Sequence, residues 1–186
     1  RPKGTLSFWF RPVITIDSSL QLTQGIWGKK ESDNTNFFMI FEGKDFFASS
    51  VVKAPGKLLT KMEEPQGGFY LETKRSDYTV NTWYYAAWSW GPNGSTLYIN
   101  GALEDSSSNC RTVTGSGVDE IGRSYFDSSN LPDNLPRNYT GALDEFRIET
   151  AVRSKDWIKL CFMNQRTDDK LIIFQETESL SGFHDK

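Results

Sequence analysis

The run "WYYAAWSWGPNGSTLYINGAL", residues 83–103, constrains the fold of this chain more than any other stretch. It holds two apolar segments of strand length, separated by "GPNG", and the second segment runs directly into Asn100–Gly101. Such short connections are typical of β-hairpins, because Asn and Gly tolerate a positive φ. Successive hairpins make neighbouring strands antiparallel, so these residues predict an antiparallel sheet. We expect Asn100–Gly101 to form a turn rather than to bind a ligand.

Similar strand-like segments follow one another along most of the chain. Aromatic and β-branched residues enrich each of them, and turns containing Gly or Pro separate them. The further segments are residues 4–12, 24–30, 36–43, 45–53, 67–75, 118–126 and 141–149. Since no regularly spaced helices interleave with these strands, the pattern favours an all-β fold, a two-sheet antiparallel β-sandwich of the jelly-roll type. In residues 4–12, the side chains of Leu6, Phe8 and Phe10 are expected on one face.

One segment near the C-terminus has the spacing of a helix instead. In "VRSKDWIKLCFMNQ", Trp157, Leu160 and Cys161 form an apolar stripe, Ser154 is a candidate N-cap, and Asp156 falls in the first turn. We therefore predict one short helix over about residues 154–162, packed on the outside of the sandwich. A last strand is expected at about 171–175, so that a single domain spans residues 1–175 and a polar tail spans 176–186.

Length and charge narrow the class of partner. A chain of 186 residues is long enough for one domain with its own core. Its net charge of −3 argues against nucleic acid as a ligand, because phosphate binding needs clustered Lys and Arg. No apolar run approaches the length of a membrane span, and we expect the chain to be part of a larger multidomain protein. The two cysteines, Cys110 and Cys161, are compatible either with a disulfide or with free thiols.

The sequence offers no familiar catalytic arrangement. The only histidine, His184, lies in the C-terminal tail, which excludes triads built on histidine, and zinc-type ligand clusters are absent too. Glycosidases built on a sandwich place acids as E-x-D-x-x-E along one strand, because alternate residues then face one cleft. The nearest match, "ESDNTN" at residues 31–36, has Asn36 in the place of the last acid. We therefore predict that the protein is not an enzyme.

Five motifs in order resemble those of the laminin-G-like, concanavalin A-like jelly-roll family. They are "GTLSFWFRP", "QGIWGKK", "WYYAAWSWGPNGSTLYINGAL", "EIGR" and "GALDEFRIETAVRSKDWI". In addition, "RSKDWIKLCFMNQ" is similar to a segment that follows this domain in many secreted bacterial proteins, notably those that degrade polysaccharides. The resemblance implies a secreted or cell-surface location and a partner that is a polysaccharide or other glycan. Two functions follow: a non-catalytic carbohydrate-binding module, or an adhesion or protein-interaction module of a bacterial surface or secreted protein.

Candidate binding residues come from two places. In residues 83–90, alternation divides the side chains into two faces. The face expected in the inter-sheet core carries Tyr84, Ala86, Trp88 and Trp90, and the other carries Trp83, Tyr85, Ala87 and Ser89. The resemblance implies that the second face lines the concave sheet, where ligands of jelly-roll lectins sit. Tyr85 is the best candidate there, with a packing role as the alternative.

The second place is the long connecting segment "GRSYFDSSNLPDNLPRNYTG", residues 122–141. It mixes aromatic, acidic and amide side chains, as sugar recognition requires: a ring for the C–H face of a pyranose and planar polar groups for its hydroxyls. A solvated surface loop is the alternative interpretation. The candidate ligand-binding residues are Trp27, Tyr85, Arg123, Tyr125, Phe126 and Asp127.

The resemblance also implies a structural Ca²⁺ near the closing strand. The matching carboxylate is Asp144, which would meet backbone carbonyls from the N-terminal strand. A buried carboxylate must be satisfied by a cation or by hydrogen-bond donors, and Arg147 or backbone amides are the alternative to the metal.

Overall fold

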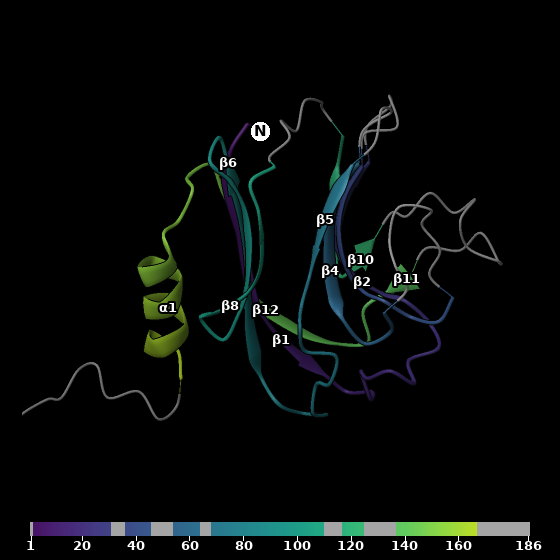
Figure 1. Ribbon diagram of the computed structural model, residues 1–186. Coiled ribbons are helices and arrows are strands. Elements are labelled where there is room, and N and C mark those ends of the chain that lie inside the picture. Colours follow the sequence, from purple (N-terminus) through teal and green to yellow (C-terminus); the bar gives the residue numbers. More distant parts are fainter. Residues whose placement is uncertain are drawn as a thin grey trace, which may run out of the picture.

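The computed structural model describes residues 2–30, 36–45, 54–63, 68–109, 117–124 and 137–166. These residues form two five-stranded antiparallel sheets that face each other, with one helix outside them (Figure 1). The first sheet has the order β12 (Gly141–Glu149), β1 (Gly4–Pro12), β6 (Tyr84–Gly91), β7 (Gly94–Ile99) and β8 (Ala102–Ser107). The second has the order β5 (Phe69–Glu72), β4 (Leu58–Glu63), β3 (Asn36–Phe41), β2 (Gln24–Lys30) and β9 (Asp119–Ile121). The predicted all-β sandwich is confirmed.

The main core lies between the two sheets and follows the alternation predicted from the sequence. In β1, Leu6, Phe8 and Phe10 are completely buried in this core. In β6, the same is true of alternate residues: the core contains Tyr84, Ala86, Trp88 and Trp90. The Trp88 indole donates a hydrogen bond of 2.7 Å to the Ser95 hydroxyl, which satisfies its polar N–H inside the apolar interior.

The helix α1 (Lys155–Asn164) covers the outer face of the first sheet (Figure 1). The Ser154 hydroxyl accepts a hydrogen bond of 3.2 Å from the Trp157 N–H, so the predicted N-cap is confirmed. Ile158 is completely buried, and it packs in a second apolar cluster with Trp9, Tyr85, Ala87 and Tyr98. The predicted helix of residues 154–162 is therefore confirmed, and it continues to Asn164.

Within the two main sheets, the sequence does not predict the strands β4 and β8. In β4, Thr60 and Lys61 are 1% and 2% exposed, so polar residues occupy buried positions that a hydrophobic pattern cannot reveal. The sequence of β8, "ALEDSS", lacks the aromatic and β-branched residues typical of strands. This strand forms because Asn100 and Gly101, with φ of 51° and 73°, turn the chain back onto β7. The predicted turn is confirmed.

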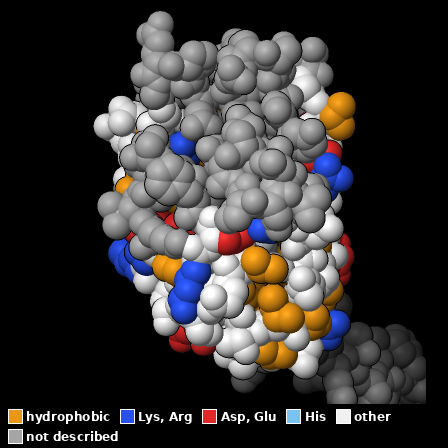
Figure 2. Space-filling model, turned by 90° about the vertical axis from the view of Figure 1, so that its right-hand side faces the viewer, with side chains coloured by type: hydrophobic (Ala, Val, Ile, Leu, Met, Phe, Trp, Pro, Cys, Tyr) orange, Lys and Arg blue, Asp and Glu red, His pale blue; other side chains and the backbone are white. Residues whose placement is uncertain are grey.

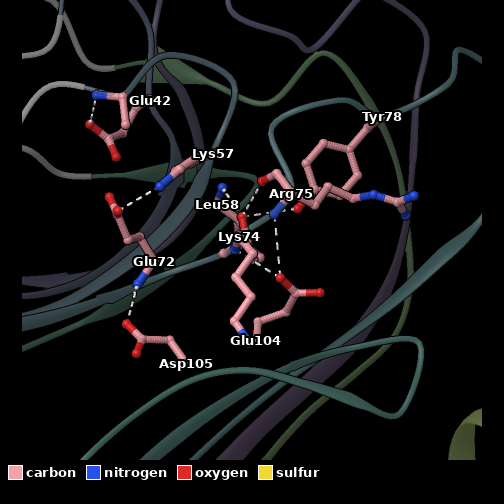
Figure 3. A network of polar contacts seen from close by, with 11 residues as sticks. Glu42, Lys57, Leu58, Glu72, Lys74, Arg75, Tyr78, Glu104 and Asp105 are labelled. Carbon is pink, nitrogen blue, oxygen red and sulfur yellow. Dashed lines mark hydrogen bonds and ion pairs between the residues drawn. The ribbon is translucent and has the colours of Figure 1, made fainter.

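Carboxylates join the two sheets along the side formed by the edge strands β5 and β8. The Asp105 carboxylate accepts a hydrogen bond of 3.1 Å from the Glu72 N–H, and Glu104 accepts one of 2.8 Å from the Lys74 N–H (Figure 3). Nearby, the Lys57 ammonium lies 2.6 Å from the Glu72 carboxylate. Because an edge strand exposes unpaired N–H groups, these carboxylates satisfy the edge and close this side of the sandwich.

The small sheet of β10 (Arg123–Ser124) and β11 (Arg137–Asn138) shows that residues 122–141 do not form a loop throughout. Several sequence predictions lie outside the described residues, namely the strand at 171–175, the tail at 176–186, most of the strand at 45–53, and Cys110. Cys161 is a free cysteine. In the part of the chain that the structure describes, no helix has the length and apolar character needed to cross a membrane.

Candidate functional site

A cavity of about 810 Å³ opens on the outer face of the first sheet, at the C-terminal end of α1. We call it the α1 cavity. Four parts of the structure line it: the strands β1 and β12, the residue before β6, the turn between β7 and β8, and the C-terminal end of α1 with the two residues after it. The lining residues are Trp9, Trp83, Asn100, Asp144, Glu145, Phe162, Gln165 and Arg166.

Trp9 connects the sheet to the helix at this cavity. In the sheet it lies opposite Asp144 of β12 on one side and Tyr85 of β6 on the other. Its ring centroid is 5.8 Å from that of Phe162, and its indole N–H donates a hydrogen bond to the Gln165 side chain. Trp9 is only 8% exposed, so it anchors the end of α1 and leaves little ring surface for a ligand.

Trp83 is the most accessible ring of the cavity, with 40% of its surface exposed. It directly precedes β6 and is not part of the apolar cluster in which α1 packs on Tyr85. The Arg11 guanidinium lies 5.3 Å from the centroid of the Trp83 ring. A cation at this position is attracted to the ring by about 0.5–1 kcal/mol at an exposed site, which helps to hold the ring in place.

A β-bulge directs two acidic side chains toward the same cavity. Glu145 and Phe146 of β12 stand opposite Phe8 alone, since the register shifts between Ser7 and Trp9. Neighbouring residues in a regular strand point to opposite faces, but at this bulge both Asp144 and Glu145 line the cavity. Glu145 has a φ of 50°, a left-handed conformation that is uncommon for a residue other than Gly.

Asn100 combines the predicted turn with a place in the cavity lining. Its N–H donates a hydrogen bond of 2.7 Å to the Tyr85 carbonyl, and its side-chain oxygen accepts one of 2.9 Å from the Tyr85 N–H. At the neighbouring Gly101, a Cβ would lie 3.1 Å from the Cα of Lys159, so a glycine allows α1 to approach this turn.

Tyr85 and Trp27 are not the exposed platforms predicted from the sequence. Each is 2% exposed. Tyr85 lies beneath α1 and stacks on Phe162, and burial raises its pKa to about 12. Trp27 belongs to the main core, where it meets Trp88 edge-on. Tyr85 therefore has the packing role that the sequence left open, because α1 covers the face on which its ring lies.

Arg123 lies far from this group, at the small sheet beside β2 (Figure 1). Its side chain is 39% exposed and lies 3.4 Å from the Glu120 carboxylate. The other candidates of this segment, Tyr125, Phe126 and Asp127, lie outside the described residues. Their role in binding stays a prediction.

Asp144 is exposed, in contrast to the buried carboxylate expected from the sequence. Its Oδ1 accepts a hydrogen bond of 2.7 Å from the Glu145 N–H. Within the described ranges, no group of three or more His, Cys, Asp or Glu residues is placed to hold one metal ion. Because Ca²⁺ takes six to eight oxygen ligands, a Ca²⁺ at Asp144 would depend mainly on carbonyl oxygens and water. The metal stays a prediction, and these residues alone do not supply its ligand set.

Sequence reasoning missed most of the cavity lining. Trp83 could have been found, because alternation puts it on the same face as Tyr85. Gln165 and Arg166 follow the predicted end of the helix at residue 162, and Phe162 is predicted only as part of its apolar stripe. For Glu145, the sequence contains no signal of the bulge.

The fold and this site define a class of protein, a lectin-like β-sandwich with a ligand-sized cavity on one outer face. The family model of the concanavalin A-like lectin/glucanases superfamily matches residues 3–159. The chain belongs to this family. The comparison with curated proteins found no match.

Three solved structures illustrate the proteins to which this chain is similar in fold. Domain 4 of an extracellular arabinanase from Geobacillus stearothermophilus, in complex with arabinotriose, has 16% identity, a TM-score of 0.59, and coverage of 85% of this chain and 65% of that one. The CBM40 of a Ruminococcus gnavus IT-sialidase, bound to α2,3-sialyllactose, has 12% identity, a TM-score of 0.57, and coverage of 86% and 82%. A SAP-like pentraxin from Limulus polyphemus has 12% identity, a TM-score of 0.54, and coverage of 85% and 68%. The chain thus spans just under two thirds of the arabinanase structure, and at these identities the likeness shows the fold alone.

Proposed function

We propose that this domain is a non-catalytic glycan-binding module and that the α1 cavity is its binding site. The lining of the cavity carries the proposal. An indole with 40% of its surface exposed lies beside carboxylate, amide and guanidinium groups. Sugars are bound by this combination, because the ring takes the C–H face of a pyranose and the planar polar groups take its hydroxyls. A concave site with a few convergent polar groups is also the usual form of a small-ligand site.

The similar structures support this class of ligand. One contains arabinotriose and another contains sialyllactose. The acids of the cavity also favour binding over hydrolysis. A glycosidase needs two carboxyl groups that flank the scissile bond from opposite sides, whereas Asp144 and Glu145 are neighbours on one strand, and Glu145 is paired with Arg147. Such a module would act within a larger secreted or cell-surface protein that handles polysaccharide.

The test is calorimetry, after a screen of the domain against arabinan, xylan, mannan, β-glucan, pectin and lactose. We expect a dissociation constant in the micromolar to millimolar range, since few sugar hydroxyls become fully desolvated. Trp83→Ala removes the accessible ring and should weaken binding about tenfold, which corresponds to about 1.4 kcal/mol. Leu103→Ala is the matched control, because Leu103 is 45% exposed and does not line the cavity.

Arg123→Ala tests the other site considered from the sequence. If Arg123→Ala abolishes binding and Trp83→Ala preserves it, the function stands and the site lies at β10. If the domain retains none of these glycans, the proposed function is wrong.

A protein-interaction module is the second candidate, and one observation favours it. Exposed hydrophobic side chains gather at the lower end of the face opposite α1 (Figure 2). Contiguous apolar surface of this kind marks interaction sites in many soluble proteins. If none of the glycans binds, a protein-interaction module is favoured over a glycan-binding module.

A further inference from the structure

We propose that the α1 cavity selects an uncharged sugar and excludes glycans that carry carboxylates, such as sialylated or uronic-acid chains. The selection would come from Asp144 and Glu145, while Trp83 supplies affinity. This inference rests on the proposed function, because it names the class of ligand of the same cavity.

The charges at the cavity come from three elements. β12 supplies Asp144 and Glu145 to the lining, and Arg166, which follows the end of α1, also lines the cavity. β1 supplies Arg11, which lies next to Trp83 but does not line the cavity. The Arg166 guanidinium lies 5.4 Å from the centroid of the Phe162 ring, so it is held on the helix side of the cavity. Glu145 is paired with Arg147, which offsets its charge.

Asp144 is the acid of the cavity that has no counter-ion among the described residues. Its one hydrogen bond among the described residues comes from the Glu145 N–H, and it forms no ion pair with any of them. The carboxylate is exposed at the cavity, where an acidic sugar would place a second negative charge close to it. Like charges a few ångströms apart repel each other strongly in a partly enclosed site, so an acidic ligand should bind more weakly than its neutral counterpart.

The bulge in β12 gives the two acids a geometry suited to hydroxyl groups. Ionised carboxylates only accept hydrogen bonds, and adjacent hydroxyls of a neutral sugar can donate to two of them side by side. A regular strand would send Glu145 to the opposite face from Asp144. The structure instead holds Glu145 at a φ of 50°, which costs free energy that a Gly at this position would avoid.

Trp83 completes the site for a neutral ligand. The Arg11 guanidinium lies over its ring without lining the cavity, and 40% of the Trp83 surface is exposed. The surface of the ring that lines the cavity is thus available to the apolar face of a sugar. An indole beside hydrogen-bond acceptors suits an uncharged sugar ring. The indole packs on the apolar face of the sugar, and the acceptors bind its hydroxyl groups.

The experiment uses ligand pairs in which only one member is acidic: lactose against α2,3-sialyllactose, xylan oligosaccharides without and with glucuronic acid, and methyl-esterified polygalacturonate against polygalacturonate. The full chain should bind the neutral member of at least one pair at least tenfold more tightly than the acidic one, by calorimetry. Asp144→Asn and Glu145→Gln keep the shape but remove a charge. Each should weaken binding of the neutral member by about threefold to tenfold and should narrow the preference for it. Glu149→Gln, on the same strand but outside the cavity, is the matched control. It should change neither the affinity for the neutral member nor the preference for it over the acidic member.

A second variant separates binding from folding. Glu145→Gly removes the carboxylate and tolerates the positive φ, so we expect an unchanged or higher melting temperature together with weaker binding. Equal binding of neutral and acidic members, or an unchanged preference in both charge variants, would overturn the inference and leave the function intact. If EDTA abolishes binding of the neutral sugar, the carboxylates act through a cation and direct recognition is wrong. If no member of any pair binds, the proposed function fails as well.

Discussion

Asp45 joins segments of the chain that are far apart in sequence through a single carboxylate. Its Oδ1 accepts hydrogen bonds from the N–H and the hydroxyl of Thr23, at 2.7 and 2.8 Å. Its Oδ2 accepts one from the Arg137 Nε at 2.8 Å, and both side chains of this ion pair are 10% exposed. Because Arg137 begins β11, which pairs with β10, this contact fixes the small sheet that carries Arg123.

Asp45→Ala should therefore lower the free energy of unfolding by about 3–5 kcal/mol, since it removes the carboxylate that pairs with a nearly buried guanidinium and also accepts two hydrogen bonds from Thr23. The measurement is urea denaturation. Asp45→Leu combined with Arg137→Met should be less damaging than either single change, because a pair of apolar side chains leaves no uncompensated charge. A loss below about 1 kcal/mol for Asp45→Ala would show that solvent already screens this pair.

At the scale of elements, α1 depends on the sheet beneath it. It has 10 residues, and an isolated helix of this length is marginal in water. Its stability must come from docking, through the buried Ile158 and the contacts of Phe162 with Trp9 and Tyr85. The same docking positions Gln165 and Arg166 at the α1 cavity, so a weaker helix contact should also weaken the binding of a ligand.

Ile158→Ala should lower the free energy of unfolding by about 2–4 kcal/mol, because it leaves a cavity at the centre of the second cluster. It should also reduce affinity for any glycan that the α1 cavity binds. Leu160→Ala is the control within the same helix, since Leu160 is 46% exposed and its loss should cost less than about 0.5 kcal/mol. Equal effects of the two variants on urea unfolding would contradict the docked position of α1.

At the scale of the whole molecule, buried tyrosines make stability depend on alkaline pH. Burial raises the pKa of Tyr85 to about 12, from an ordinary value of 10.0, and burial also raises the pKa of Tyr78 and Tyr139. The Tyr85 hydroxyl faces Ser7 and Arg147 of the sheet and Cys161 of α1, whose own thiol pKa is raised by burial. In each case the folded state keeps a proton that the unfolded chain loses at lower pH.

The contribution of these tyrosines to the free energy of unfolding should thus be constant at pH values below the ordinary tyrosine pKa of 10.0. It should fall as pH rises through 10.0 toward about 12, because the unfolded chain then binds fewer protons than the folded protein. The midpoint of urea unfolding, measured at several pH values across this range, shows how steeply the free energy of unfolding falls with pH. Tyr85→Phe removes one of the titrating groups, so the free energy of unfolding of this variant should decline less steeply with pH. An identical slope in Tyr85→Phe would contradict the buried, protonated hydroxyl.

The sequence alone determined those features that depend on neighbours along the chain. The alternation in β1 and β6 decided which side chains enter the core, Asn100–Gly101 decided the turn between β7 and β8, and Ser154 decided the start of α1. Each of these follows from contacts within a few residues, where backbone geometry fixes the direction of a side chain.

Only the tertiary structure decided which side chains on the outer face can reach a ligand. Trp83 and Tyr85 share a face in the sequence pattern, yet the first is 40% exposed and the second 2%. The difference comes from α1, which packs on the cluster that contains Tyr85, whereas Trp83 is not part of that cluster. In the same way, the bulge that turns Glu145 toward Asp144 depends on the pairing of β12 with β1, which lie at opposite ends of the described chain. Contacts between residues so distant in sequence leave no local periodicity, and for that reason the site could not be read from the chain itself.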